Sequence, residues 1–314
     1  MRNAGTSIII LSLGLDYLFG DPPNRFHPVA WMGSLISWAQ RFKPDCNPGK
    51  EFLYGAGISL GGGFLVFQIV RLLIQLTQIL PLPFRYLAQA AMLKMTFSVR
   101  GLAQAAREVQ SKLTDGDLNS ARSLLAWHLV SRDTTNLDPS QVASATIESI
   151  AENASDGILA PLFYYALGGL PLTFFYRFTN TADSMLGYHT PFLEWLGKFP
   201  ARLDDLLNYI PARLTGLSMI LAAILCGEDA HRAWGGMRGE ARNTLSPNAG
   251  FPMSAMAGAL GVELIKVGQY RLGTGGDDPQ NEDIQRATRI MIWSVVLGTT
   301  LLAVIKGCIN KLEK

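Results

Sequence analysis

Three acidic residues at regular spacing are the first feature of the sequence that could do chemistry. Glu148, Glu152 and Asp156 follow one another at intervals of four residues, and on a helix such residues line one face. Three carboxylates on one face repel one another unless a positive charge lies among them. Mg²⁺ prefers carboxylate oxygens, so the spacing predicts a magnesium site here. The alternative is a solvated helix face whose acids pair with arginines elsewhere.

A second group of polar residues lies further along the chain. Asp204 and Asn208 are four residues apart, so they share a helical face. Carboxylates beside arginines are typical of a metal-phosphate site, because the guanidinium offers a planar fork of donors. The alternative is a structural network of ion pairs. The group comprises Asn180, Asp183, Asp204, Asp205 and Asn208, with Arg202 and Arg213 as the flanking arginines.

One histidine and one polar turn are weaker candidates. His27 follows the turn Gly20-Asp21-Pro22-Pro23 and precedes a proline, so both a structural role and a role as a general base stay open. The segment Ser246-Pro247-Asn248-Ala249-Gly250 is a polar turn inside an uncharged stretch. Its backbone N–H groups, with Ser246 and Asn248, could bind an anion.

The sequence contains neither of the two most familiar phosphate-binding loops. It has no Gly-x-x-x-x-Gly-Lys-Ser/Thr segment and no strand-linked Gly-x-Gly-x-x-Gly segment. A nucleotide site in this protein would therefore be of another type. The net charge of +2 and the lack of a Lys/Arg run argue against a nucleic-acid partner.

The composition indicates a membrane protein. Charged residues make up 17% of the chain, against about 25% in soluble proteins, and mean hydropathy is positive. A spanning helix needs about 20 mostly apolar residues. Windows 52–70 and 157–176 meet that length, whereas we expect the shorter ones to be tilted, interfacial or buried in protein. The shorter windows are 8–15, 214–227 and 290–305.

A polar helical region at about 84–156 separates the first two spans. Helices are expected over 84–113, 118–130 and 139–153, and Asp138 with Gln141 forms a capping-box pattern at the start of the last one. No long alternating stretch predicts a sheet. We therefore predict an all-α, polytopic integral-membrane protein with broken or re-entrant segments and a polar helical insertion, forming a single membrane-embedded domain over residues 1–314.

The second span raises a question of geometry. If 157–176 crossed the bilayer as one helix, Asp156 and Asp183 would lie about 30 Å apart on opposite sides. The segment contains Pro161, Gly168-Gly169 and Pro171, which favour a break. We predict a broken or re-entrant hairpin that returns Asn180 and Asp183 to the vicinity of Glu152, and irregular backbone at that depth must be buried in protein or line a cavity.

Seven ordered motifs, spread from Asp16 to about Tyr270, resemble the CobD/CbiB family of cobalamin biosynthesis. Their order and spacing make the resemblance far more specific than any single block. They are Gly20-Asp21-Pro22 with His27-Pro28-Val29 and Met32-Gly33; Arg132-Asp133-Thr134; Glu148-Ser149-Ile150-Ala151-Glu152-Asn153 with Asp156-Gly157; Pro161-Leu162-Phe163; Asn180 with Asp183-Ser184-Met185 and Gly187-Tyr188; Asp204-Asp205 with Asn208 to Leu214; and Ser246 to Gly250.

The resemblance implies an adenosylcobinamide-phosphate synthase, which is an ATP-consuming ligase. Such an enzyme joins a corrin propionate of adenosylcobyric acid to aminopropanol or aminopropanol phosphate as an amide. A carboxylate must be activated before it reacts, most simply as an acyl phosphate made from ATP with Mg²⁺, and this transfer needs positioning and charge neutralisation. The amine must be neutral to attack, so a general base is also needed.

These requirements assign expected roles to the candidate residues. Glu148, Glu152 and Asp156 would hold Mg²⁺. The other assignments form two groups. Asp183, Asp204, Asp205 and His27 are the candidates for catalysis, and Arg202, Arg213, Asn180, Asn208, Ser246 and Asn248 are the candidates for binding substrate or phosphate.

Two other functions stay open at this point. Intramembrane acids and broken helices also mark transport sites, so a corrinoid carrier is one alternative, although the sequence shows no inverted repeat. A non-catalytic scaffold for other membrane enzymes of the pathway is the second. The expected location is the cell (inner) membrane, with membrane lipid as a neighbour and a site that faces the cytoplasm, where ATP is present.

Overall fold

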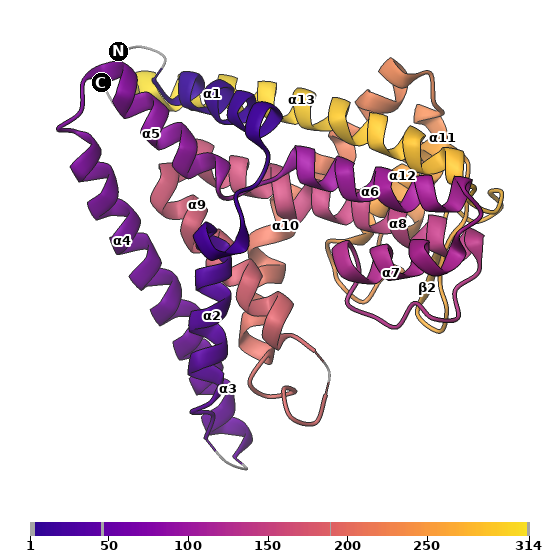
Figure 1. The fold of residues 1–314 in the computed structure, drawn as a ribbon, viewed down its shortest axis with the longest axis horizontal. Coiled ribbons are helices and arrows are strands. Elements are labelled where there is room, and N and C mark those ends of the chain that lie inside the picture. The colour runs from indigo at the N-terminus through magenta and orange to yellow at the C-terminus, as the bar shows by residue number, and fades with distance from the viewer. Residues whose placement is uncertain (1–3, 45–46, 189, 313–314) are drawn as a thin grey trace. The chain divides into compact units, whose positions relative to one another are not determined.

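The structure, a computed structural model, describes residues 4–44, 47–188 and 190–312. Helices dominate these residues, and the two short strands pair as one antiparallel hairpin (Figure 1). The predicted all-α class is confirmed. Within the described ranges, four helices are long and apolar enough to cross a membrane. They are Pro48–Thr77, Pro139–Leu186, Lys198–Cys226 and Asn281–Ile309.

Two of these spans are longer than the sequence windows indicated. The uncharged windows 214–227 and 290–305 lie largely within longer helices that begin at Lys198 and Asn281. Each window alone is shorter than a membrane span, but the helix that contains it is long enough, because the charged residues before the window continue the same helix. The N-terminal apolar patch is a separate helix of 16 residues.

The chain folds into two compact units, which we describe one at a time. The first contains Met1–Ser98, Ala160–Asn208 and Leu301–Lys314. Within it α4 packs on α9, α1 on α5, and α2 on α9. Its elements are α1 (Ala4–Phe19), η1 (Asn24–Phe26), α2 (Pro28–Gln40), α3 (Pro48–Ala56), the π-helical turn η2 (Gly57–Gly61), α4 (Gly62–Thr77), α5 (Leu82–Lys94), α9 (Ala160–Leu186), and parts of α10 (Lys198–Cys226) and α13 (Asn281–Leu312).

Helix α9 is a hairpin rather than one straight helix. Gly169 has a φ of 70° and a ψ of −166°, which breaks the helix between its two arms. The rings of Tyr164 and Tyr176 stack with their centroids 4.9 Å apart, although twelve residues of straight helix would separate them by about 18 Å. Thr173 also donates a hydrogen bond to the carbonyl of Pro161 at 3.3 Å. The predicted break is confirmed, and the approach of Asp183 to Glu152 stays a prediction.

The second unit contains Val99–Leu159 and Tyr209–Thr300. Helix α8 lies at its centre, with an unbroken run of buried residues from Val142 to Ala151, and packs on α6, α7, α12 and β1. Residues 209–226 of α10 and 281–300 of α13 also belong to this unit. Its other elements are α6 (Val99–Thr114), α7 (Leu118–His128), α8 (Pro139–Asn153), the π-helical turn η3 (Ala154–Leu159), α11 (Ala230–Glu240), α12 (Gly250–Leu260), β1 (Leu264–Lys266) and β2 (Tyr270–Leu272).

Local signals placed most of these elements correctly. Asp138 and Gln141 form the predicted reciprocal capping box at the start of α8. The expected helix over 84–113 is instead two helices, because the chain turns at Met95 and Thr96, where the Thr96 hydroxyl donates to the carbonyl of Leu93 at 2.6 Å. The hairpin of β1 and β2 was not expected, since three-residue strands give no alternating pattern.

Candidate functional site

A buried polar network of the first unit surrounds the carboxylate of Asp204. Asp204 is 7% exposed. Asn180, on the second arm of α9, donates to its Oδ1 at 3.2 Å, and Asn208, one turn further along α10, donates to its Oδ2 at 2.8 Å. The hydroxyl of the fully buried Tyr176 donates to Asn208 at 2.8 Å. The α9 hairpin and α10 therefore fix one carboxylate with uncharged donors only.

Two further carboxylates lie beside Asp204. The charges of Asp183 and Asp205 both act on it, and among the described residues no lysine, arginine or histidine forms an ion pair with it. Arg202 interacts electrostatically with Asp205. A Cβ at Gly187 would collide with the Asp183 carboxylate, so glycine at that position leaves room for the acid. Such a group of three acids attracts a cationic ligand, because a buried carboxylate without a cation is costly.

The carboxylate of Glu148 is the corresponding buried acid of the second unit. It is 5% exposed. Ser144 donates to Oε1 at 3.2 Å, and Tyr270, on strand β2, donates to Oε2 at 3.0 Å. Arg132 lies 3.5 Å from Oε2 as an ion-pair partner, and Lys266 is a further positive neighbour. Protein donors therefore occupy both oxygens of Glu148.

Tyr270 acts in this cluster as a permanent donor. Burial, and next the charge of Glu148, raise its pKa far above the usual range, and the charge of Glu152 adds to the effect. The tyrosine stays protonated and can only donate to the carboxylate. The charges of Glu148 and Glu152 both act on the Tyr270 hydroxyl, so both acids lie near this hydroxyl in the second unit.

The three acids predicted to bind Mg²⁺ do not form a compact metal cluster. Within residues 4–44, 47–188 and 190–312, no group of three or more His, Cys, Asp or Glu side chains is arranged to hold a metal ion. Glu148 is buried, Glu152 is exposed, and Asp156 lies on the turn η3, where the wider π-helical winding changes the four-residue spacing. Their assignment to Mg²⁺ stays a prediction.

Arg213 forms a third group, also in the second unit. Its guanidinium lies 3.5 Å from the ring centroid of Tyr209 and 4.0 Å from that of Phe251. One nitrogen donates to the Tyr209 carbonyl at 2.6 Å and to the Asn248 side chain at 3.2 Å. Arg242 is a second positive charge close by. Because the rings fix the guanidinium plane, Arg213 is a preorganised donor for an anion.

The turn at Ser246 supports this arginine instead of offering free N–H groups. The N–H groups of Asn248 and Ala249 donate to the Ser246 hydroxyl oxygen at 3.2 and 3.3 Å. These two N–H groups therefore donate within the turn, which holds Asn248 in contact with Arg213. Asn248 thus contacts Arg213, and the assignment of Ser246, Asn248 and Arg213 to substrate or phosphate binding stays a prediction.

His27 lies in a separate cluster of the first unit. Its Nδ1 accepts a hydrogen bond from the N–H of Val29 at 3.2 Å and so caps α2. Its Nε2 lies 3.8 Å from Asp21, which also contacts the buried Lys94. Burial favours the neutral acid, but hydrogen bonds from His27, Lys94 and Ser98 outweigh it and hold the pKa of Asp21 far below its usual value. Both nitrogens of His27 thus have structural partners.

Sequence reasoning missed the partners of the buried acids. Lys94 and Tyr270 carried no motif, and Arg132 stood out only as part of Arg132-Asp133-Thr134.

The segment Gly57-Ile58-Ser59-Leu60-Gly61 also matches the pattern of a nucleophile elbow. It lies inside a continuous helix with no strand before it, and Ser59 is fully buried. The pattern is therefore coincidental.

Comparisons with known proteins agree with the motif order. The model of the CobD/Cbib protein family matches residues 9–291. The probable cobalamin biosynthesis protein CobD of Methanothermobacter thermautotrophicus is 40% identical over 297 residues, which are 95% of this chain and 96% of that protein. The cobalamin biosynthesis protein CobD of Dehalococcoides mccartyi is 42% identical over 266 residues, covering 85% of this chain and 86% of that protein.

A third relative carries the family's other name. The cobalamin biosynthesis protein CbiB of Salmonella typhimurium is 36% identical over 303 residues, covering 92% of this chain and 93% of that protein. No solved structure matches the chain. Because the family model spans most of the sequence and these relatives align almost end to end, the chain belongs to the CobD/CbiB family.

Proposed function

We propose that this protein acts in cobalamin biosynthesis as an adenosylcobinamide-phosphate synthase. It would join a corrin propionate of adenosylcobyric acid to aminopropanol or aminopropanol phosphate, with ATP as the activating co-substrate. Beyond family membership, the main support for the proposal is the hydrogen-bond network around Asp204. A buried carboxylate, fixed by two amides and flanked by two further acids, suits a ligand that arrives as an ammonium ion and must lose a proton before it reacts.

Each step of the amide formation has a candidate group in this proposal. Asp204, with Asp183 and Asp205, would bind the ammonium group and accept its proton. The free amine then attacks the activated corrin carbonyl, phosphate leaves, and the new C–N bond is the product amide. Asn180 and Asn208 would position Asp204. Arg213, whose plane Tyr209 and Phe251 fix, would bind a phosphate of the substrate or of ATP.

Mg²⁺ is assigned in this proposal to two of the three predicted acids. In nucleotide sites Mg²⁺ is bound by one or two carboxylates together with phosphate oxygens and water, so a cluster of three acids is not required. Glu152 and Asp156 would hold the ion, which when bound neutralises phosphate charge. Glu148 would instead position Arg132 and Tyr270, since its oxygens already accept from protein donors.

The location and partners of the protein follow from the same proposal. Use of ATP places the site on the cytoplasmic side of the inner membrane, where other membrane enzymes of the pathway are candidate partners. A corrinoid carrier is the second function that the fold allows, because acids beside a broken helix are also found at transport sites.

An in-vitro ligation tests the proposal. The full chain in detergent would receive adenosylcobyric acid, Mg²⁺, ATP and either amine, and mass spectrometry would follow the corrinoid. We expect an ATP-dependent gain of the mass of one amine less one water. Tight binding of the corrinoid without product, with either amine and with ATP present, would refute the ligase and favour the carrier.

A further inference from the structure

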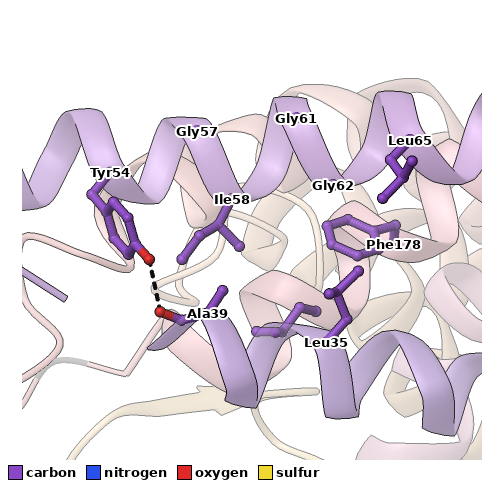
Figure 2. A pocket seen from close by; sticks show the side chains of 10 residues that line it. Leu35, Ala39, Tyr54, Gly57, Ile58, Gly61, Gly62, Leu65 and Phe178 are labelled. Atoms are coloured by element: carbon purple, nitrogen blue, oxygen red, sulfur yellow. Dashed lines mark hydrogen bonds between the residues drawn. The ribbon is translucent and has the colours of Figure 1, made fainter. Parts of the chain in front are cut away.

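A narrow apolar groove runs along one face of the first unit, outside the groups described above. It lies between α2 and the continuous helix α3–η2–α4, with Phe178 of α9 at its floor (Figure 2). Its volume is about 270 Å³. Leu35, Ile58 and Phe178 point into it, and the hydrogen bond from the Tyr54 hydroxyl to the Ala39 carbonyl, 2.8 Å long, closes one end.

Two glycines on the wall of the groove have no structural reason to be glycine. Gly57 and Gly61 have φ values of −60° and −67°, which any residue adopts. A Cβ at either position would meet no atom within 4 Å. By contrast, a Cβ at Gly62 would collide with Phe178. The space beside Gly57 and Gly61 is therefore left open rather than filled by protein, and π-helical turns such as η2 often occur at functional sites.

The dimensions of the groove fit one leaflet of a bilayer. The helix from Tyr54 to Leu65 is about 16 Å long, and half of the roughly 30 Å hydrocarbon core is about 15 Å. Helix α3–η2–α4 is one of the candidate spans, and its exposed Leu65 forms the other end of the groove. A chain of methylene groups lying along the groove would therefore reach from the interface to the middle of the membrane.

The Tyr54 end of the groove has the chemistry of a membrane interface. Trp38, on α2, is 57% exposed, and Phe42, just after α2, is 60% exposed, and aromatic side chains concentrate at the headgroup level. Lys50 lies one helical turn before Tyr54 on the same face. This lysine is exposed, so this end is suited to an anionic phosphate.

We propose that this groove binds an anionic phospholipid, with one acyl chain between α2 and α3–η2–α4 and its phosphate at Lys50. The open glycine wall accepts the chain, and the lysine selects the headgroup. This site is independent of the proposed ligase activity, because it uses none of the residues assigned to that reaction.

Photolabelling of the full chain tests the proposal. The protein would be placed in bilayer discs that contain either phosphatidylglycerol or phosphatidylcholine with a diazirine in the middle of one acyl chain, and labelled peptides would be mapped by mass spectrometry. We expect labelling of α2 and of the segment 54–65 by phosphatidylglycerol. The variant Gly57→Leu/Gly61→Leu should lower that labelling roughly tenfold, because it fills the space of several methylene groups.

Two further variants make the test specific. Gly14→Leu is the matched control, since Gly14 is exposed on α1 and its Cβ would also meet no atom within 4 Å; its groove labelling should be unchanged. Lys50→Gln should lower labelling by phosphatidylglycerol by roughly fivefold and leave that by phosphatidylcholine unchanged. Leu35→Trp fills the groove from the opposite wall in case the double leucine variant does not fold.

The outcomes separate the two parts of the inference. Groove labelling that is equal in the wild type and in a folded groove-filling variant would overturn the site, as would its absence from the wild type. Equal labelling by the two lipids that does not respond to the charge variant would overturn the choice of an anionic headgroup.

Discussion

Two buried carboxylates, one in each unit, are held in opposite ways. Glu148 meets an arginine, a tyrosine and a serine, so its charge has a cationic partner within the protein. Asp204 meets two amides and has two other carboxylates as neighbours. A buried charge that is already paired contributes to the fold, whereas one that lacks a cation costs stability. The comparison agrees with the proposed ligand-binding role of Asp204 and with a structural role for Glu148.

The largest expected effect is on activity at Asp204. Asp204→Asn keeps the shape and removes the charge, so amide formation should fall by about 10²- to 10⁴-fold, as for the loss of a general base. Thermal stability should change little, because relief of the repulsion from Asp183 and Asp205 is offset by the new side-chain NH2 group, which faces an amide donor of Asn180 or Asn208. Product formation in the ligation assay and the melting temperature are the two measurements.

The control for this variant is Asp115→Asn, at an exposed acid outside the network. Its product formation should equal that of the wild type. If Asp204→Asn ligates at the rate of the wild type, Asp204 has no part in the reaction and the contrast between the two carboxylates fails.

In contrast to Asp204→Asn, Glu148→Gln should mainly lower stability. Arg132 would lose its ion-pair partner, and we expect the free energy of unfolding to fall by about 1.5–3 kcal/mol. A double-mutant cycle with Arg132→Gln measures the pair directly, since the double variant should be less destabilised than the sum of the two single variants. A zero coupling energy would show that Arg132 does not stabilise Glu148.

Gly169→Ala tests whether the hairpin supports Asp204. The φ of 70° and ψ of −166° at this position are available almost only to glycine, so alanine should cost about 1–3 kcal/mol. Because the second arm of α9 carries Asn180, amide formation should fall as well. Gly14→Ala, on a helix with room for a methyl group, should keep full stability. Equal melting temperatures for both variants would contradict the hairpin.

The smallest effect concerns a third carboxylate, Asp21, which pairs with Lys94 as Glu148 does with Arg132. Its pKa is lowered in the folded protein, so the unfolded chain binds the proton more readily. Its contribution to stability is therefore fully present above the unfolded value of about 3.9 and is lost as pH falls through the folded pKa. The melting-temperature difference between the wild type and Asp21→Asn should shrink below about pH 4; a constant difference would show that the charge does not matter.

Much of the fold could be predicted because its signals are local. The capping box at Asp138 and the break at Gly169 each depend on a few neighbouring residues. The apolar windows located all four spans, although the charged N-terminal parts hid the true length of the helices that begin at Lys198 and Asn281.

The partners in the candidate site could not be predicted in the same way. Tyr270 lies 122 residues from Glu148, and Lys94 lies 73 residues from Asp21, so only the folded chain brings them together. Helical spacing did predict that Asp204 and Asn208 share a face. For Asp156 the spacing argument stays a prediction, because η3 winds more widely than the α-helix that the argument assumes.

The π-helical turn at Gly57–Gly61 has a consequence for insertions and deletions. An α-helix turns about 100° per residue, so one residue more or fewer before Gly62 would rotate all of α4 by that angle without breaking the helix. Gly63, whose Cβ would lie 2.8 Å from the ring of Phe175, would then leave its place, and a larger side chain would face α9. A shortened chain of this kind would keep its helical content and its hydropathy profile, although α4 would present the wrong face to α9. Neither circular dichroism nor a hydropathy plot would therefore reveal the defect.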